Sequence, residues 1–451
     1  MKRKAIKVLA VPALGALLMA CGCATPDFRG TVSDAKDAVF PSLVYIRVVM
    51  RDLDGGKDAK AQASGSGVII SPDGELITNH HVVDKATDIR CQLSDGSSYS
   101  AKVLGQDKDL DVALLKLERP DGAPPLPAAT LSSRKAEVGE VVLAMGAPWG
   151  LARSVSMGII SCNDRFLEGA GKYTLWYQTD AAISPGNSGG PLVDTDGMVI
   201  GLNARGVSLG DQAFTIPSPV IIEALPRLRE KGVADWSWFG LDLQPLNDFQ
   251  HNISFDADEG VIVSGTEPGS PARKAGFLPN DRIVSIDGEK LTARNWENLP
   301  AIERRLGRLP FGKAVAFSVD RDGKPVTISV APTEKGKVEG EEKAFERWGF
   351  TAKEINRFDV PQLAFFAPDG GLFISAILWD GNADNCGFRR NDIIQAIDGV
   401  PVKTVEELSA IYDAALKDIE SKSKMTVDVI RRGRRAQLVL NYLEDTEKEL
   451  P

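Results

Sequence analysis

The sequence predicts a mainly β protein built from several domains, and three observations support that fold class. The first is length, because 451 residues exceed what one hydrophobic core usually serves and suit about three ordinary domains. The second is a series of short β-rich runs, separated by turn signals, between residues 41 and 217. The third is an internal repeat, in which residues 276–288 resemble residues 387–399.

The N-terminus has the features of an export signal and not of a folded domain. Basic residues at positions 2, 3, 4 and 7 precede an uncharged, apolar stretch over residues 8–20. This stretch has the length of a signal peptide and is too short to span a bilayer comfortably. We therefore predict a signal peptide over residues 1–23, a short polar tether over residues 24–35, and export to the periplasm or cell envelope.

Cys21 is the candidate lipidation site. Residues 18–21 read Leu-Met-Ala-Cys and resemble the lipobox of bacterial lipoproteins, in which the cysteine is lipidated and becomes the new N-terminus. Met19 is unusual at its position of that motif, so ordinary cleavage after Ala24 is the alternative. The first possibility predicts contact with the membrane through a lipid anchor, and the second does not.

Composition and charge argue against two other classes of function. The formal net charge is −9 and no basic run follows the N-terminus, whereas a nucleic-acid partner needs a concentrated Lys/Arg face. The five cysteines include no CxxC pair and no Cys/His cluster with the spacing of metal ligands. We predict no nucleic-acid partner, no metal site and no organic cofactor.

Residues 41–217 show the pattern of many short strands. The β-rich runs at residues 43–49, 67–70 and 112–117 are separated by turn signals such as Pro-Asp-Gly. Short strands without helices between them predict an all-β sandwich or barrel. Residues 218–232 follow with apolar side chains on one face, which predicts a helix.

Three segments of this region carry residue types that together serve nucleophilic catalysis. His81 follows a predicted strand, Asp111 stands at the start of a buried one, and Ser188 lies in the run Gly-Asn-Ser-Gly-Gly-Pro. Acyl transfer by a serine needs a base to take the hydroxyl proton and a group to orient that base. It also needs backbone donors directed at the developing oxyanion, and the glycine-rich turn of Gly186, Asn187 and Ser188 is the candidate for these.

These motifs resemble those of the HtrA/Deg family of bacterial serine proteases, and the resemblance extends from about residue 33 to the end of the chain. It implies that Ser188 is the nucleophile, His81 the general base and Asp111 the orienting carboxylate. The order His, Asp, Ser is that of the chymotrypsin-like double β-barrel. Spacings of 30 (111 − 81) and 77 (188 − 111) residues put His81 and Asp111 in the first barrel and Ser188 in the second.

Two neighbouring residues compete for these assignments. His80 is adjacent to His81, but the family pattern Thr-Asn-x-His-Val-Val puts His80 at the variable position. Asp109 competes with Asp111, but only Asp111 directly precedes the buried strand. We therefore interpret Asp109 as a solvated acid of a loop.

The substrate pocket is inferred from departures from the family pattern. Ala182 and Ile183 stand where a trypsin-like enzyme carries its acidic pocket residue, and Phe214 lies beside the expected substrate strand. The resemblance therefore implies a small, apolar pocket that accepts Val, Ala or Ile and not basic side chains. Ser184 replaces the family's usual Asn, a small polar exchange that we expect to preserve activity.

The repeat in the second half resembles the core of two PDZ domains, which bind the free carboxylate at a peptide C-terminus through backbone N–H groups of one loop. The candidate peptide-binding loops are Phe239, Gly240 and Leu241 in the first copy, and Trp348, Gly349 and Phe350 in the second. The alternative is that one copy, most simply the second, is structural and binds no peptide.

The predicted organisation follows from these assignments. A chymotrypsin-like serine protease domain is expected over residues 36–232, a first PDZ domain over residues 236–333, a charged linker over residues 334–344 and a second PDZ domain over residues 345–445. The predicted fold class is thus mainly β: a chymotrypsin-like double β-barrel followed by two PDZ domains, which are partly open α+β barrels.

The leading hypothesis is an ATP-independent serine endopeptidase of the cell envelope that degrades unfolded or damaged proteins, with PDZ domains that bind peptide C-termini. One alternative is a signalling protease that a PDZ ligand activates, for which the polar segment 163–172 is the candidate regulatory loop. Another is a lipid-anchored chaperone or binding protein with an inert protease domain. The resemblance also implies a homo-oligomer, a trimer built through the protease domain.

Overall fold

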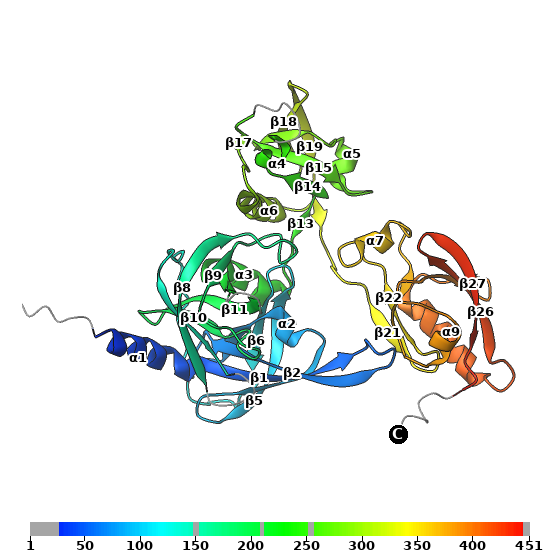
Figure 1. Cartoon of the computed structure of the whole chain (residues 1–451), viewed down its shortest axis with the longest axis horizontal. Helices are drawn as coiled ribbons and strands as arrows, with labels where there is room; N and C mark the ends of the chain where they lie inside the picture. The colour runs from blue at the N-terminus through cyan, green and yellow to red at the C-terminus, as the bar shows by residue number, and fades with distance from the viewer. Residues whose placement is uncertain (1–26, 148–152, 208–211, 251–256, 445–451) are drawn as a thin grey trace, which may run out of the picture.

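The computed structural model describes residues 27–147, 153–207, 212–250 and 257–444 (Figure 1). Two β-barrels lie side by side, one small domain lies above them in the view of Figure 1, and a second small domain lies beside them. The predicted signal peptide and Cys21 lie outside the described residues. Within these ranges, no helix is both long enough and apolar enough to cross a membrane.

The predicted tether is wrong for most of its length, because Phe28–Val39 form helix α1. Val32, Ala35 and Val39 repeat at helical spacing, and the last two are buried in a core that the two barrels share. This apolar stripe is narrow and most of the remaining positions are polar, which is why the composition indicated a tether. A single 3-10 turn, η1 (Phe40–Ser42), then leads into the first barrel.

The first barrel is a closed sheet in the order β1-β2-β3-β6-β5-β4. Its elements are β1 (Leu43–Asp52), β2 (Ala59–Ile69), β3 (Glu75–Thr78), α2 (His80–Val83), β4 (Ala86–Gln92), β5 (Ser98–Asp107) and β6 (Val112–Leu117). Strands β1 and β2 continue beyond the barrel as a long hairpin that reaches the second small domain (Figure 1). Strand β6 is apolar at almost every position because both of its faces are buried.

The second barrel is closed in the order β10-β11-β12-β9-β8-β7. Its strands are β7 (Val141–Gly146), β8 (Ser154–Arg165), β9 (Trp176–Thr179), β10 (Pro191–Asp194), β11 (Val199–Val207) and β12 (Gln212–Pro217). Helix α3 (Ser218–Lys231) follows and buries Ile221, Leu225 and Leu228, so the predicted helix is confirmed. It ends at Gly232, whose left-handed φ of 72° forms the C-cap.

One apolar core lies between the barrels and determines where the candidate site forms. Val68, Ile77 and Leu114 of the first barrel belong to the same buried cluster as Leu143 and Leu202 of the second. Because this core holds the two barrels together, the loops that follow β3, precede β6 and precede β10 meet at the seam between them.

The first small domain has a sheet in the order β14-β15-β16-β18-β19, with β17 paired to β16. Its elements are β14 (Leu241–Gln244), α4 (Leu246–Gln250), β15 (Val261–Thr266), α5 (Pro271–Ala275), β16 (Arg282–Ile286), β17 (Glu289–Lys290), η3 (Trp296–Asn298), α6 (Leu299–Gly307), β18 (Val315–Arg321) and β19 (Lys324–Val330). Two further strands, β13 (Ser237–Trp238) and β20 (Thr333–Glu334), pair the two chain ends of the domain. We call this pair the stem.

The second small domain repeats that topology in the order β22-β23-β24-β26-β27, with β25 paired to β24. Its elements are β21 (Glu342–Phe345), β22 (Phe350–Glu354), α7 (Pro361–Ala364), β23 (Leu372–Ile377), α8 (Asn382–Asn385), β24 (Ile393–Ile397), β25 (Val400–Pro401), α9 (Val405–Lys417), β26 (Lys424–Arg431) and β27 (Arg434–Asn441). Strand β21 extends the sheet beyond β22, so the end of the predicted linker is part of this domain.

Candidate active site

His81 and Asp111 are brought together by the pairing of two neighbouring strands. Strand β3 pairs with β6 so that Thr78 lies opposite Ala113, which puts α2 and the start of β6 at the same edge of the barrel. The Nδ1 atom of His81 lies 2.8 and 3.0 Å from the two carboxylate oxygens of Asp111, and the His81 backbone N–H donates to Oδ1 at 3.0 Å. A carboxylate can only accept, so Nδ1 carries the proton and Nε2 of the neutral ring is an acceptor.

The two competing residues have other contacts. Asp109 was expected as a solvated acid, but its carboxylate oxygens lie 2.7 and 2.8 Å from Nζ of Lys335. The partner is far along the chain, so no local pattern indicated this ion pair. His80 is buried with Nε2 3.8 Å from Asp84, and its Nδ1 has no hydrogen-bond partner among the described residues. In that part of the chain, His81 is the histidine that contacts Asp111.

Ser188 lies in a tight turn that the first barrel holds in place. Asn187 N–H donates to the Ser184 carbonyl at 2.9 Å, and Gly186 has a φ of 99°, as the third residue of a type II turn requires. The Ser66 hydroxyl donates to the Gly186 carbonyl at 2.7 Å, and the Ser66 N–H donates to the Ser188 carbonyl at 2.8 Å. Strand β2 therefore fixes the turn from the opposite barrel.

Two backbone donors of this turn are unoccupied. Within the described ranges, no hydrogen bond uses the N–H of Gly186 or of Ser188. The N–H of Asn187 is used by Ser184, and its side chain is buried beside Ser154, so including Asn187 among the oxyanion donors was wrong. Because the Asn187 N–H is directed at the Ser184 carbonyl, the N–H groups of Gly186 and Ser188 are the two donors of this turn that an oxyanion could use.

The Ser188 hydroxyl is turned away from the imidazole. It donates to the carbonyl of Ala204 at 3.2 Å, and no hydrogen bond joins it to His81 in the described part of the chain. Ala204 lies in a β-bulge of β11, so its backbone is not committed to the ladder with β12. The turn of Ser188 and the segment that carries His81 are nevertheless in contact, because a Cβ on Gly189 would lie 3.2 Å from Asn79 N. Catalytic hydrogen bonds are often long or misaligned until substrate binds.

A cleft of about 840 Å³ opens beside Ser188. Ala182 and Ile183 line it, whereas Phe214, the third expected pocket residue, does not. Side chains alternate along β12, so Ala213 faces the cleft and Phe214 is buried in the core. Asp180 and Arg205, which were not predicted from the sequence, also line the cleft and give it one charge of each sign. The alternation of side chains along β11 and β12 was the signal that could have identified Arg205 and Ala213 as cleft residues.

In the first small domain, the predicted peptide-binding loop ends at an open sheet edge. Gly240 has a φ of 71°, and a Cβ there would lie 2.2 Å from that of Ser270, so the loop requires glycine. Among the described residues β14 pairs only with β15, and its outer edge is the kind to which PDZ ligands add a strand. Lys172, from the segment interpreted as regulatory, reaches this edge. Its Nζ donates to the Leu241 carbonyl at 3.4 Å and lies 3.1 Å from Glu303 of α6.

The equivalent loop of the second small domain has no such open edge. Phe239 and Trp348 are both buried in the cores of their domains. In the second domain, however, β21 lies against both β22 and α9, and Phe345 stands opposite Phe350. Phe345 is fully buried among aromatic rings that include Trp348. The prediction that Trp348, Gly349 and Phe350 bind a peptide is therefore wrong for this structure, because the chain's own strand takes the edge.

The comparisons with known proteins agree with this architecture. Residues 65–202 match the trypsin-like peptidase domain family, and residues 238–331 match the PDZ domain family. Fold and site together define a trypsin-like serine peptidase with PDZ-type domains on the C-terminal side of its barrels.

Relatives narrow that class further. Over 379 residues the chain is 35% identical to a "probable periplasmic serine endoprotease DegP-like" of Marinomonas sp. (strain MWYL1), covering 82% of this chain and 77% of the relative. A protein of the same description from Pseudomonas savastanoi pv. phaseolicola is 30% identical, with 95% of each chain covered. Among solved structures, the HtrA-type protease AlgW with a tripeptide is 30% identical, with a TM-score of 0.60 over 68% of this chain and 97% of that one.

The chain belongs to the DegP-like serine endoproteases of the HtrA type. It is a serine endopeptidase, and the predicted fold class is confirmed: two chymotrypsin-like barrels are followed by PDZ-type domains. The small domains are accordingly called the first PDZ domain and the second PDZ-type domain below.

Proposed function

We propose that this chain is an ATP-independent endopeptidase of the cell envelope that degrades unfolded or damaged proteins, with Ser188 as nucleophile, His81 as general base and Asp111 as its orienting carboxylate. The observation that carries the proposal is the pair of contacts from Nδ1 of His81 to Asp111, beside a serine turn with two backbone donors that have no acceptor among the described residues. Acyl transfer needs these elements together. The relatives' description as periplasmic endoproteases supports an envelope location.

In this mechanism Ser188 first leaves the Ala204 carbonyl and turns its hydroxyl toward Nε2 of His81. Nε2 takes the hydroxyl proton as Oγ attacks the carbonyl carbon of the scissile peptide bond, and negative charge moves to the carbonyl oxygen. The N–H groups of Gly186 and Ser188 donate to that oxygen, and one such donor lowers the barrier by about 3–4 kcal/mol. The imidazolium, stabilised by Asp111, then protonates the leaving amine, and water hydrolyses the acyl-enzyme.

The cleft supports a small aliphatic residue on the acyl side of the scissile bond. Ala182, Ile183 and Ala213 present little polar surface there. Asp180 and Arg205 carry opposite charges, so the cleft as a whole favours neither acidic nor basic side chains. Folded proteins bury most of their aliphatic residues and unfolded ones expose them, which is how such a cleft selects unfolded substrates.

Cleavage of casein without ATP tests this function. Ser188→Ala should lower the rate by about 10⁴- to 10⁶-fold, because the nucleophile is lost. Ser421→Ala, which removes an exposed hydroxyl of the second PDZ-type domain, serves as the matched control and should leave the rate unchanged. Mass spectrometry of the products should show Val, Ala or Ile before most cleavage sites. Equal rates for wild type and Ser188→Ala would refute the proposal.

A protease that a peptide ligand activates is the second candidate function, and the contacts of Lys172 favour it. A peptide strand added to β14 needs the backbone groups of Leu241, one of which Lys172 occupies. Synthetic decapeptides that differ in their last residue should then raise the wild-type rate selectively, and Lys172→Met should need less peptide. Equal rates with every peptide and in both variants would leave constitutive degradation as the function.

We also propose a lipid anchor at Cys21 and a trimeric assembly, both of which rest on the sequence resemblance. Cys21→Ser should move the protein from the membrane fraction to the soluble fraction. Light scattering of the purified chain should give the mass of three copies.

A further inference from the structure

The loop that carries Asp111 is closed by its own hydrogen bonds. Asp107 ends β5, and its Oδ1 accepts from the Leu110 N–H at 3.0 Å. The Asp111 N–H donates to the Lys108 carbonyl at 3.2 Å, and Asp111 has a φ of 56°, a left-handed value that Asp adopts more readily than most residues. The direction of the Asp111 carboxylate therefore depends on this loop staying closed.

Trp236 contacts the loop from the start of the first PDZ domain. It directly precedes stem strand β13, and its Nε1–H donates to Oδ2 of Asp107 at 3.2 Å. Trp236 is only 2% exposed and stacks on Tyr173, with ring centroids 4.1 Å apart and planes 5° from parallel. The guanidinium of Arg227 lies 4.6 Å from the ring centroid. The ring also lies against Gly307 of α6, where an added Cβ would be 2.6 Å from the indole, so a shift of the first PDZ domain would disturb the indole and its bond to Asp107.

Lys335 contacts the same loop from the other end of that domain. It directly follows stem strand β20, and it forms the ion pair with Asp109 described above. Its backbone N–H donates to the Trp236 carbonyl at 2.8 Å. Because β13 and β20 pair, both chain ends of the first PDZ domain form one unit that contacts the Asp111 loop at Asp107 and Asp109.

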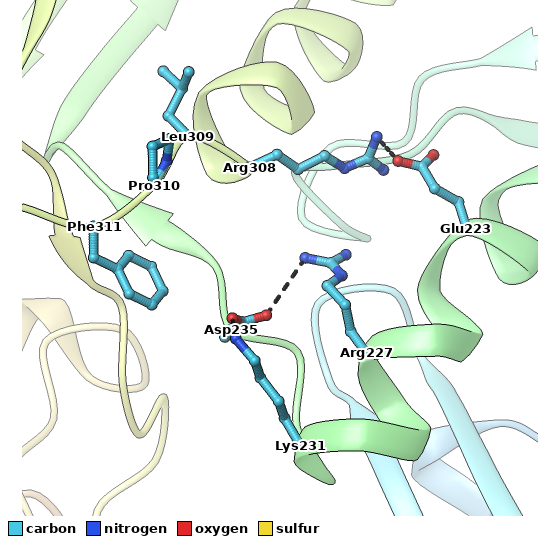
Figure 2. Close-up of a pocket in the computed structure, with 8 residues that line it drawn as sticks. All are labelled: Glu223, Arg227, Lys231, Asp235, Arg308, Leu309, Pro310 and Phe311. Carbon is cyan, nitrogen blue, oxygen red and sulfur yellow. Dashed lines mark hydrogen bonds and ion pairs between the residues drawn. The ribbon is translucent and has the colours of Figure 1, made fainter. Parts of the chain in front are cut away.

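An exposed ion pair also joins the two domains near the stem. Figure 2 shows the pocket between α3 and the end of α6, where Arg308 pairs with Glu223 and, largely buried, Arg227 reaches Asp235 at 3.9 Å. An exposed pair such as Arg308–Glu223 contributes little stability and can break and re-form as domains move. The bond from Trp236 is buried, and losing it would leave a buried carboxylate with one donor fewer, which is more costly.

We propose that Asp107 and Trp236, with Asp109 and Lys335, are positioning residues that couple the placement of the first PDZ domain to that of Asp111. The proposal rests on the catalytic roles assigned above to Asp111 and His81. A shift of the stem opens the loop, and His81 then loses the carboxylate that orients it. None of the four residues lines the cleft beside Ser188, so the coupling acts on the chemical step and not on substrate binding.

The Trp236→Phe variant tests the coupling with a small change. It keeps an aromatic ring beside Tyr173 and Arg227 and removes the N–H donor, together with part of the buried volume of the indole. We expect kcat to fall about tenfold, as for loss of one hydrogen bond to a charged acceptor, with KM changed by less than about twofold. Trp379→Phe, at an exposed indole of the second PDZ-type domain, is the control and should change neither constant.

Asp107→Ala shows whether both residues act through one bond. The double variant Trp236→Phe/Asp107→Ala should be about as slow as Asp107→Ala alone, because that change already removes the acceptor of the Trp236 bond. Hydrogen exchange at residues 107–111 should be faster in both single variants, whereas circular dichroism should stay unchanged. Additive losses in the double variant would contradict the coupling.

A second pair of variants keeps the proposal testable if Trp236→Phe folds poorly. Lys335→Met removes the ion pair with Asp109, and Lys337→Met removes an exposed pair with Glu341 in the same linker. Only the first should lower kcat. If Ser188→Ala abolishes cleavage but both Trp236→Phe and Lys335→Met keep kcat within about twofold of wild type, this inference fails and the proposed function stands. If Ser188→Ala cleaves casein, the proposed function fails first.

Discussion

The two PDZ-type domains share one topology but differ at the edge strand. In both, a β-bulge follows the second residue of that strand, between Asp242 and Leu243 in the first domain and between Thr351 and Ala352 in the second, so the strands can be aligned. The edge of β14 is open to an added strand, whereas the edge of β22 is filled by β21. A repeated fold therefore does not repeat its binding site.

The same two domains also differ in what they contact on the protease. The stem of the first reaches the loop of Asp111, next to the proposed catalytic residues. The second contacts the tip of the long β1–β2 hairpin, where Thr351 Oγ1 donates to the Leu53 carbonyl at 2.6 Å and Glu346 accepts from the Asp58 N–H at 3.0 Å (Figure 1). The second also pairs Glu342 of β21 with Lys85 after α2, so the difference between the domains lies in the contacts of the first with Asp107 and Asp109.

The largest effect is expected for Phe345→Ala. The Phe345 ring is fully buried in the core of the second PDZ-type domain. Its removal should therefore lower the free energy of unfolding of that domain by about 3–5 kcal/mol. Lys172→Ala, at the edge of β14 in the first PDZ domain, should cost less, about 1–3 kcal/mol, because it removes no core ring but leaves the buried carboxyl of Glu303 without its ion-pair partner. Urea denaturation followed by hydrogen exchange within each domain measures both. Similar losses of stability in the two variants would contradict the distinction between the filled edge of β22 and the open edge of β14.

The glycines of the two loops give the next largest effect. A Cβ on Gly240 would lie 2.2 Å from that of Ser270, whereas a Cβ on Gly349 would lie 3.2 Å from Asn382 N. Both glycines have a positive φ, so alanine at either one costs about 1–2 kcal/mol, and only Gly240→Ala adds a collision with a neighbouring side chain. Gly240→Ala should therefore have the lower thermal midpoint and lose any peptide-dependent activation. Equal midpoints would show that the first loop can rearrange.

The sequence predicted the parts of this protein that depend on local pattern. The strands, the helix over residues 218–232, and the choice of His81 and Asp111 over their neighbours all follow from periodicity or motif position. Phe214 was misplaced because the side of a strand that faces a cleft depends on register. Asn187 was misplaced because N–H direction within a turn follows from backbone dihedrals.

Contacts between segments far apart in the chain could not be predicted from the sequence. Strand β21 lies in a stretch whose charge and glycine content indicated a linker, and only its pairing with β22 makes it part of a domain. The ion pair of Asp109 with Lys335 and the bond of Trp236 to Asp107 join residues more than a hundred positions apart. No spacing or composition rule connects such residues, since their proximity arises from how the domains are placed.

The pH dependence of stability should distinguish the contact of the first PDZ domain at Asp107 from the contact of the second PDZ-type domain at Leu53. Burial, with the nearby charge of Asp109, raises the pKa of Asp107 to about 7, above its value in an unfolded chain. The contribution of Asp107 is therefore fully present below the unfolded pKa and is lost as the pH rises through about 7. Asp107→Asn does not titrate, so the thermal midpoint of wild type should fall relative to that variant between about pH 4 and pH 7 and level off above that range. A difference in thermal midpoint that does not change with pH would contradict a buried, titrating carboxyl at Asp107.

The smallest effect is expected for Thr351→Val at the joint of the second PDZ-type domain. The substitution keeps the shape of the side chain and removes one hydroxyl donor to Leu53, at a cost of about 1 kcal/mol. Hydrogen exchange at the hairpin tip should become faster, whereas kcat should stay unchanged, and Thr426→Val serves as a control because its exposed hydroxyl contacts only the turn at Asp398 in its own domain. The Thr351 hydroxyl and the Leu53 carbonyl are both uncharged, so the shift in thermal midpoint should be the same at every pH. If Thr351→Val instead lowered kcat as Trp236→Phe is expected to do, the hairpin would also transmit domain position to the catalytic residues, and the division between the two domains would have to be abandoned.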